Sequence, residues 1–220
     1  VPEPAFVSFN RGCSFYGTFE DTTATPEMIA LQARIDPDGF NRAEAMQRLT
    51  DIEKIRLINA QDACISELWV NTYRAALEDR SVPAGLSGHI LGIKEQTLSR
   101  KYVPYYRERY NARITLLRKV GESTEDQLLE RFRSIDTYSR PSTPRDGIEE
   151  RMLKAILLRS LIELDTPEIH ELAETHFRRA WNITDKTNAL ACIHLSSYDR
   201  KKERLEEAFN LWKDNISGYS

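Results

Sequence analysis

The chain has 220 residues, which is enough for one large domain or two small ones with a sizeable core. Charged residues make up 30% of it, and 31 Lys and Arg against 34 Asp and Glu give a net charge of −3, which argues against a dedicated nucleic-acid or anionic-membrane binder. Apolar runs stay far short of the roughly 18 residues that a membrane span needs. The start also lacks a basic segment followed by an apolar stretch, so we expect a soluble protein.

The three cysteines, Cys13, Cys64 and Cys192, lie far apart, and no C-x-x-C pair exists. Neither a disulfide framework nor a thiolate zinc site is therefore expected. We interpret the cysteines as buried free thiols in a reducing compartment, which favours a cytoplasmic location. Only 9 residues are glycine, and such a low content suits long helices joined by short connections.

The segment before Asp21 is rich in residues that favour strands: Val7, Phe9, Phe15, Tyr16, Thr18 and Phe19. This pattern predicts one or two short strands. Two strands alone are marginal in water, so they should belong to a sheet that the rest of the chain does not supply. We therefore expect a β segment over residues 1–24 and a helical domain over residues 25–220.

Signals for helix starts occur throughout the second region: Thr25-Pro26-Glu27, Asp38, Ser123 with Asp126, Asp146 with Glu149, and Thr166-Pro167-Glu168. Four apolar stripes have helical spacing: Ile65 to Ala76, Leu153 to Leu164, Ile169 to Ala180, and Leu205 to Trp212. Further helices are expected over residues 39–60, 83–91, 104–120, 124–136 and 186–196. The fold class is therefore all-α, either a bundle or an α-solenoid of antiparallel helix pairs.

The segment from His170 to His176 looks like the H-E-x-x-H zinc motif, whose histidines are four residues apart. Here the spacing is six, so at about 100° per residue the two rings point about 240° apart and cannot share one ion. We expect His176 in the core, because it lies on the apolar stripe, and His170 on the surface. His89 and His194 form no pair at the required spacing, so no metal ligand is predicted.

Other catalytic patterns are weak. The sequence has no G-x-S-x-G elbow and no glycine-rich phosphate loop. The carboxylate pairs Asp36 with Asp38 and Glu206 with Glu207 have the spacing of helix caps or of a solvated face. We therefore predict no catalytic residue, and the sequence does not identify any substrate-binding residue.

Basic and aromatic residues alternate between Arg100 and Arg113. Such a stretch could stack bases and bind phosphates, which makes a single-stranded nucleic-acid binder one alternative. The same stretch also contains a helical stripe: Tyr106, Tyr110, Arg113, Ile114 and Leu117. We favour the stripe as part of a packed helix, with the tyrosine hydroxyls at its rim.

One segment, Asp36-Pro37-Asp38-Gly39-Phe40-Asn41-Arg42-Ala43-Glu44-Ala45 with Gln47 following, resembles the region after the β-sandwich domain in bacterial zinc aminopeptidases of the aminopeptidase N family. The chain has Ala43 where that family usually has Trp. Residues 1–20 resemble the last sandwich strands of the family, residues 82–91 a short helix, and residues 182–190 an Asn-x-Thr-Asp helix start. These motifs occur in the order that the family has and cover nearly all of the chain.

The resemblance implies that the chain is a C-terminal piece of such an enzyme, with an incomplete α-solenoid. The zinc site, the loop that binds the substrate amine and the catalytic tyrosine would lie upstream, so zinc would belong to the parent enzyme. The piece would cap the active site and shape a chamber for short peptides, and its partners would be the missing domains of the same polypeptide. The alternative is a free-standing helical repeat module that binds a protein partner.

Overall fold

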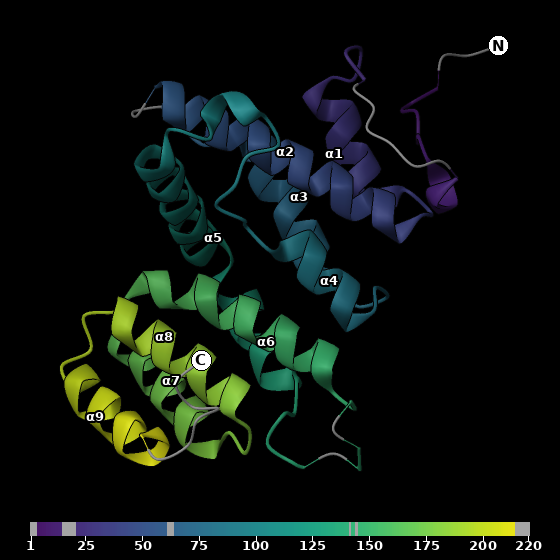
Figure 1. Ribbon diagram of the computed structural model, residues 1–220. Helices are drawn as coiled ribbons and strands as arrows, with labels where there is room; N and C mark the ends of the chain where they lie inside the picture. Colours follow the sequence, from purple (N-terminus) through teal and green to yellow (C-terminus); the bar gives the residue numbers. More distant parts are fainter. Residues whose placement is uncertain (1–3, 15–20, 61–63, 141, 144, 214–220) are drawn as a thin grey trace. The chain divides into compact units, whose positions relative to one another are not determined.

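The computed structural model describes residues 4–14, 21–60, 64–140, 142–143 and 145–213 (Figure 1). These residues form helices and no strand. The α-helices are α1 (Pro26–Ile35), α2 (Gly39–Asn59), α3 (Glu67–Glu78), α4 (Ala84–Leu91), α5 (Tyr106–Ser134), α6 (Ile148–Leu161), α7 (Pro167–Arg179), α8 (Ile183–Leu195) and α9 (Lys201–Trp212). Three short 3-10 helices are η1 (Arg11–Cys13), η2 (Arg100–Tyr102) and η3 (Ile162–Leu164). The chain divides into two compact units, Val1–Thr124 and Glu125–Ser220.

In the first unit, α1 packs against α2 and α3, and α4 packs against α2 and α3. The largest buried side chain is Trp69 on α3, whose indole N–H donates to the hydroxyl of Thr50 at 3.0 Å. Tyr73, one turn later, donates to the carbonyl of Leu91 at 2.9 Å. Each buried aromatic ring thus has a partner for its polar atom, as a close-packed core requires.

The second unit has its core between α6, α7 and α8, with α9 packed on α8. Leu157, Ile169, Ala173, Ala189 and Ile193 are each fully buried there. The apolar stripes expected on α6 and α7 are confirmed as the buried faces of these helices.

The prediction that α9 buries an apolar stripe is wrong. Of its members only Ala208 is buried, whereas Phe209 is 57% exposed and Leu205 is 37% exposed. The side chain that α9 buries next to Ala208 is Arg204. Ion pairs rather than apolar contacts therefore dominate the inner side of this helix.

The two helices expected over 104–120 and 124–136 run together as α5. Thr124 has non-helical dihedral angles (φ −141°, ψ 29°), so the expected break exists as an interruption inside one helix. The hydroxyl of Thr124 donates to the carbonyl of Val120 at 2.7 Å. A side chain that bonds back to the preceding turn in this way competes with the backbone ladder and often bends a helix.

Most capping predictions are confirmed. Thr25 accepts from the N–H of Met28, Thr166 from that of Ile169, and Asp38 from those of Phe40 and Asn41. Asn182 accepts from Asp185 at 2.8 Å and starts α8 earlier than the expected residue 186.

The two predicted capping boxes, Ser123 with Asp126 and Asp146 with Glu149, do not form. The cap of α6 is Gly147 in a left-handed conformation (φ 70°), not Asp146. The carboxylate of Asp146 accepts instead from the N–H of Thr143 at 3.0 Å. The hydroxyl of Ser123 donates to Lys119 and caps nothing. The sequence alone did not distinguish these turns from true capping boxes.

The β segment expected over residues 1–24 stays a prediction. Residues 4–14 and 21–24 contain η1 and no strand, and the strand expected around Phe15 and Phe19 lies outside the described residues. Within the described part of the chain, no helix is long and apolar enough to cross a bilayer.

Candidate functional site

The two histidines of α7 have separate partners. The Nε2 of His170 lies 2.7 Å from Oδ1 of Asp165, and the Nδ1 of His176 lies 3.3 Å from the hydroxyl of Tyr138. The two rings thus have different partners, and the expectation that they share no ion stays a prediction. The expected surface position of His170 is wrong, because this residue is only 8% exposed. Asp165, in a left-handed conformation five residues earlier, provides the partner that allows this burial.

A cluster of polar and aromatic residues lies around Lys154 of α6 and includes His176. The ammonium of Lys154 donates to the carbonyl of Ile135 at 2.6 Å, just beyond the end of α5. It also lies 4.6 Å from the ring centroid of Phe132 and 4.3 Å from that of Tyr138. Lys154 is 1% exposed. We call Phe132, Ile135, Tyr138, Lys154 and His176 together the Lys154 cluster. A buried ammonium is tolerated here because a carbonyl and two ring faces replace its hydration shell.

Burial shifts both titratable groups toward their neutral forms. It lowers the pKa of Lys154 to about 8, although Asp136 and Asp185 act in the opposite direction. It also lowers the pKa of His176 to about 4, and the positive charge of Lys154 adds to this effect. His176 is therefore a neutral imidazole at pH 7, packed edge-on against Phe132 and Tyr138. The cluster is closed, with His176 only 2% exposed, so its chemistry serves the fold rather than a substrate.

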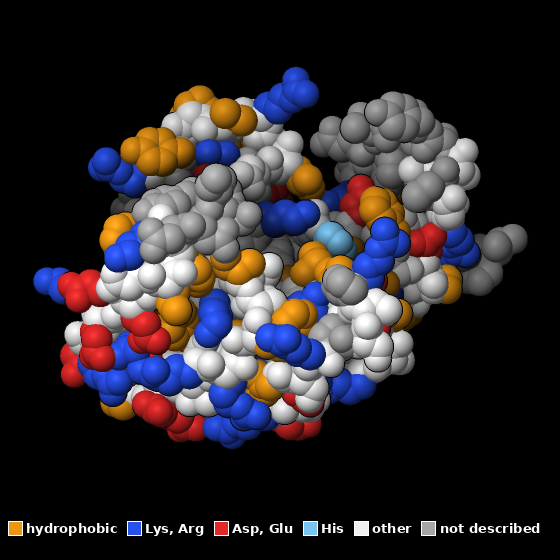
Figure 2. Space-filling view, turned by 60° about the horizontal axis from the view of Figure 1, so that its bottom comes forward, with side chains coloured by type: hydrophobic (Ala, Val, Ile, Leu, Met, Phe, Trp, Pro, Cys, Tyr) orange, Lys and Arg blue, Asp and Glu red, His pale blue; other side chains and the backbone are white. Residues whose placement is uncertain are grey.

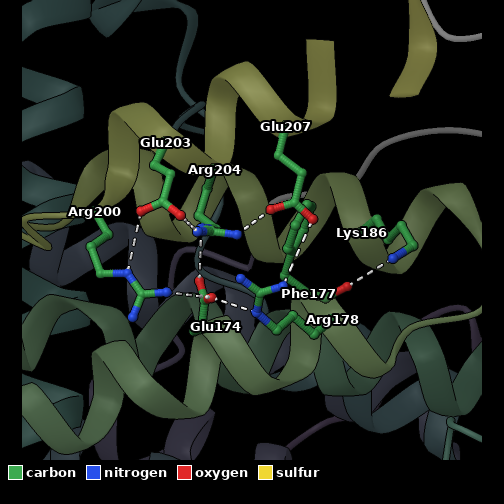
Figure 3. A network of polar contacts seen from close by, with 8 residues as sticks. All are labelled: Glu174, Phe177, Arg178, Lys186, Arg200, Glu203, Arg204 and Glu207. Atoms are coloured by element: carbon green, nitrogen blue, oxygen red, sulfur yellow. Dashed lines mark hydrogen bonds and ion pairs between the residues drawn. The ribbon is translucent and has the colours of Figure 1, made fainter. Parts of the chain in front are cut away.

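A second polar centre attaches α9 to the rest of its unit (Figure 3). Glu174 of α7 is buried and faces three guanidinium groups, which belong to Arg178, Arg200 and Arg204. The distances from its carboxylate to these groups are 2.7, 3.6 and 3.5 Å in that order. Arg204 also pairs with Glu203 and Glu207 on its own helix. We call this set the Glu174 network.

Charges of both signs continue onto the surface. Figure 2 shows Lys and Arg side chains interleaved with Asp and Glu over much of one face, with hydrophobic side chains between them. Mixed charge of this kind is typical of a solvated surface rather than of a binding site for one charge type.

The carboxylate pairs have structural roles. Asp36 accepts from the N–H of Asp38 at 2.9 Å, and Asp38 caps α2. Asp38 also accepts from the N–H of Gly12 at 2.8 Å, and this bond is the main reason that its pKa is lowered. Glu207 pairs with Arg204, whereas Glu206 is exposed. Asp36 and Asp38 thus serve the start of α2, and Glu207 serves the Glu174 network.

Cys64 and Cys192 differ in their exposure to solvent. Cys192 is buried, and burial raises its pKa to about 12, so it is an unreactive thiol. Cys64 is exposed, which contradicts its expected burial. The side chain of Cys13 lies outside the described part of the structure. Among the residues that the structure does describe, no group of three His, Cys, Asp or Glu side chains could hold a metal ion.

The stretch from Arg100 to Arg113 is arranged differently from the expected stripe. Its buried face consists of Tyr102, Arg109, Ala112, Leu116 and Leu117, whereas Tyr106 and Tyr110 are 64% and 43% exposed. Leu117 is buried as predicted, and Arg113 and Ile114 are half-buried. The prediction is therefore wrong for Tyr106 and Tyr110. Arg109, which pairs with Glu95 at 3.1 Å, occupies an inner position that the sequence pattern does not reveal.

Two comparisons identify similar proteins. A family model described as "Domain of unknown function (DUF3458_C) ARM repeats" matches residues 26–219. The crystal structure of Legionella pneumophila aminopeptidase A in complex with aspartic acid is similar with a TM-score of 0.71 at 16% identity, over 90% of this chain and 24% of that chain. At this identity the likeness shows the fold, and the chain spans about a quarter of that protein. The all-helical array and the resemblance to a helical part of the aminopeptidase N family are thereby confirmed.

Proposed function

Because the chain belongs to the DUF3458_C family of ARM-repeat domains, we propose that it is a non-catalytic helical part of a zinc aminopeptidase that removes N-terminal residues from peptides. The match of the family model over residues 26–219 carries this proposal. The shared fold with an aminopeptidase of which the match covers only 24% supports it, because that relative has room for a reactive centre outside the matched helices.

Among the residues that the structure describes, no three His, Cys, Asp or Glu side chains are grouped so that they could hold a zinc ion. His170 is engaged by Asp165 and His176 by Tyr138, and their rings belong to different clusters. Glu174, an acidic residue on the same helix, forms ion pairs with Arg178 and Arg204. Zinc of the parent enzyme would supply a metal-activated water, and its ligands would come from other parts of the polypeptide.

We propose a scaffold role for the described residues. In the complete enzyme this part would cap the active site and enclose a chamber that admits short peptides. The Lys154 cluster and the ion pairs of the Glu174 network support a rigid wall, because buried polar contacts between helices favour one arrangement of them.

The alternative, a free-standing repeat module, fits less well. Terminal repeats of such modules carry a polar outer face. Here α9 exposes Phe209 and Leu211, each by 57%. This exposed apolar surface differs from the polar outer face of a capping repeat.

Metal analysis and an assay with an amino-acyl p-nitroanilide test the proposal. We expect no stoichiometric zinc and no turnover for residues 1–220 alone. For the polypeptide that includes the upstream reading frame we expect stoichiometric zinc and turnover. A chelator should abolish that turnover. Chelator-sensitive turnover by residues 1–220, or an upstream frame without an H-E-x-x-H helix, would overturn the proposal.

A further inference from the structure

The tyrosines and cations at the start of α5 form an exposed surface that the proposed function does not use. Tyr105, Tyr106 and Tyr110 are 46%, 64% and 43% exposed. Tyr106 and Tyr110 are four residues apart on α5, so their rings lie on one helix face. Arg100, Lys101 and Arg107 are exposed beside them in sequence. We call these six residues the tyrosine–arginine surface.

The polar groups of this surface are uncommitted within the described structure. Arg100, Lys101 and Arg107 form no ion pair with another described residue, and Lys101 only lies over the ring of Tyr102, at 5.5 Å. The three tyrosine hydroxyls likewise form no hydrogen bond with described residues.

The inward-facing arginines of α5 provide the contrast. Arg109 pairs with Glu95 at 3.1 Å, and the Nε of Arg113 donates to the carbonyl of Ile93 at 2.7 Å. The fold thus provides an acid or a carbonyl for each of these two inward-facing arginines. It leaves the donors of the tyrosine–arginine surface available to a ligand.

These donors match carboxylates. Guanidinium groups bind carboxylates through paired hydrogen bonds, and phenol hydroxyls can donate to the same oxygens. Tyrosine also provides rigid contact area with a small loss of side-chain entropy, which is why it is enriched in binding sites for proteins. We propose that the tyrosine–arginine surface docks an acidic peptide segment, one rich in Asp and Glu.

A peptide fits the observations better than a single-stranded nucleic acid. A nucleic-acid groove follows the phosphate backbone with a continuous series of cations, and such domains are usually strongly basic. This chain has a net charge of −3, and Glu108 follows Arg107 directly. The inference does not depend on the proposed aminopeptidase role, because the surface contains no part of a reactive centre.

Fluorescence anisotropy of the 220-residue chain with a fluorescein-labelled decaglutamate peptide tests the inference. We expect saturable binding at low salt that weakens at 200 mM salt, because exposed charges are then screened. The double variant Tyr106→Ala with Arg107→Glu should bind at least tenfold more weakly. Both residues are exposed, so the melting temperature of this variant should match that of the wild type.

The variant Arg34→Glu provides the control. Arg34 is exposed on α1, and its substitution changes the net charge by the same amount as Arg107→Glu. Binding should change less than twofold. An equal loss with Arg34→Glu would show non-specific attraction, and tighter binding of a 15-residue oligothymidine than of the peptide would indicate a nucleic-acid surface. Either result, or no binding of decaglutamate, would overturn the inference.

Discussion

The ammonium of Lys154 and the imidazole of His176 lie against the same ring, that of Tyr138, at 4.3 and 5.6 Å from its centroid. Both groups are almost inaccessible to solvent, and no carboxylate forms a close ion pair with either of them in the described structure. The charged form of Lys154 is therefore stabilised by aromatic faces, one carbonyl, and the carboxylates of Asp136 and Asp185, which form no ion pair with it. This arrangement makes the stability of the second unit depend on pH at both ends of the scale.

At alkaline pH we expect Lys154 to add stability as the pH rises. Its pKa is about 8 in the folded chain and 10.5 in a free lysine, so between these values the unfolded chain binds more protons. The free energy of unfolding should therefore rise with pH in this window. Other groups titrate there too, so the measurement is the difference between the wild type and Lys154→Met. We expect this difference to grow in favour of the wild type between pH 8 and 10 in urea titrations, and a constant difference would contradict the pKa.

At acid pH we expect the protonation of His176 to lower the free energy of unfolding. Its pKa is about 4 in the folded chain, against 6.5 for a free histidine, so the unfolded chain binds more protons between these values. The contribution of the neutral ring is present above pH 6.5 and is lost as the pH falls toward 4, with a total of about 3 kcal/mol. His176→Phe keeps an aromatic ring beside Phe132 and should flatten the pH dependence in this window. The same steepness in His176→Phe as in the wild type would refute this role.

His194 provides the matched control for that experiment. Its ring lies in the next helix and is exposed. Substitution by Phe or Gln should leave the acid dependence as steep as in the wild type, because no desolvated imidazole is removed.

The sequence predicted the outer features of the fold better than its polar interior. Caps at Thr25, Asp38 and Thr166 follow from local chemistry, and the structure contains all three. Lys154 and Glu174 were not predicted as interior residues, because charged residues are almost never buried without partners and the partners come from distant segments. Ile135 is 19 residues from Lys154, and Arg204 is 30 residues from Glu174.

The face of α5 was misjudged for a related reason. A stripe of Tyr106 and Tyr110 has helical spacing, but so does the stripe that contains Arg109, Ala112 and Leu116. Hydrophobicity favours the first stripe. Burial of Arg109 beside Glu95 selects the second, and this ion pair joins α5 to the segment after α4, which periodicity within one helix cannot reveal.

Removal of the central carboxylate of the Glu174 network should loosen α9. In Glu174→Gln, the buried Arg204 and the half-exposed Arg178 and Arg200 lose their common partner. We expect a loss of about 2 kcal/mol in the free energy of unfolding, because Arg204 loses its buried partner on α7 but keeps Glu203 and Glu207 on its own helix. Hydrogen exchange should show the largest loss of amide protection in α9.

The exposed pair of Arg133 with Glu168 is the control for the network. Its two side chains are 59% and 63% exposed, at a distance of 3.0 Å. Glu168→Gln should cost at most about 1 kcal/mol, because solvent screens such pairs. Equal losses in Glu168→Gln and Glu174→Gln would show that burial of the network has no energetic consequence.

Asp38 joins the N-terminal segment to the first helix pair, and its two roles can be separated. One oxygen accepts from Phe40 and Asn41 at the start of α2, and the other accepts from Gly12 at 2.8 Å. Asp38→Ala removes all three bonds and should cost about 1–2 kcal/mol in unfolding free energy. Asp38→Asn keeps an oxygen for the cap but loses the charge, so it should cost less. It should also lose the decrease in stability that sets in as the pH falls below the ordinary carboxyl pKa of 3.8, which the lowered pKa of Asp38 produces. If both variants cost the same and Gly12 exchanges its amide as fast in the wild type as in Asp38→Ala, the carboxylate does not hold the N-terminal segment against α2.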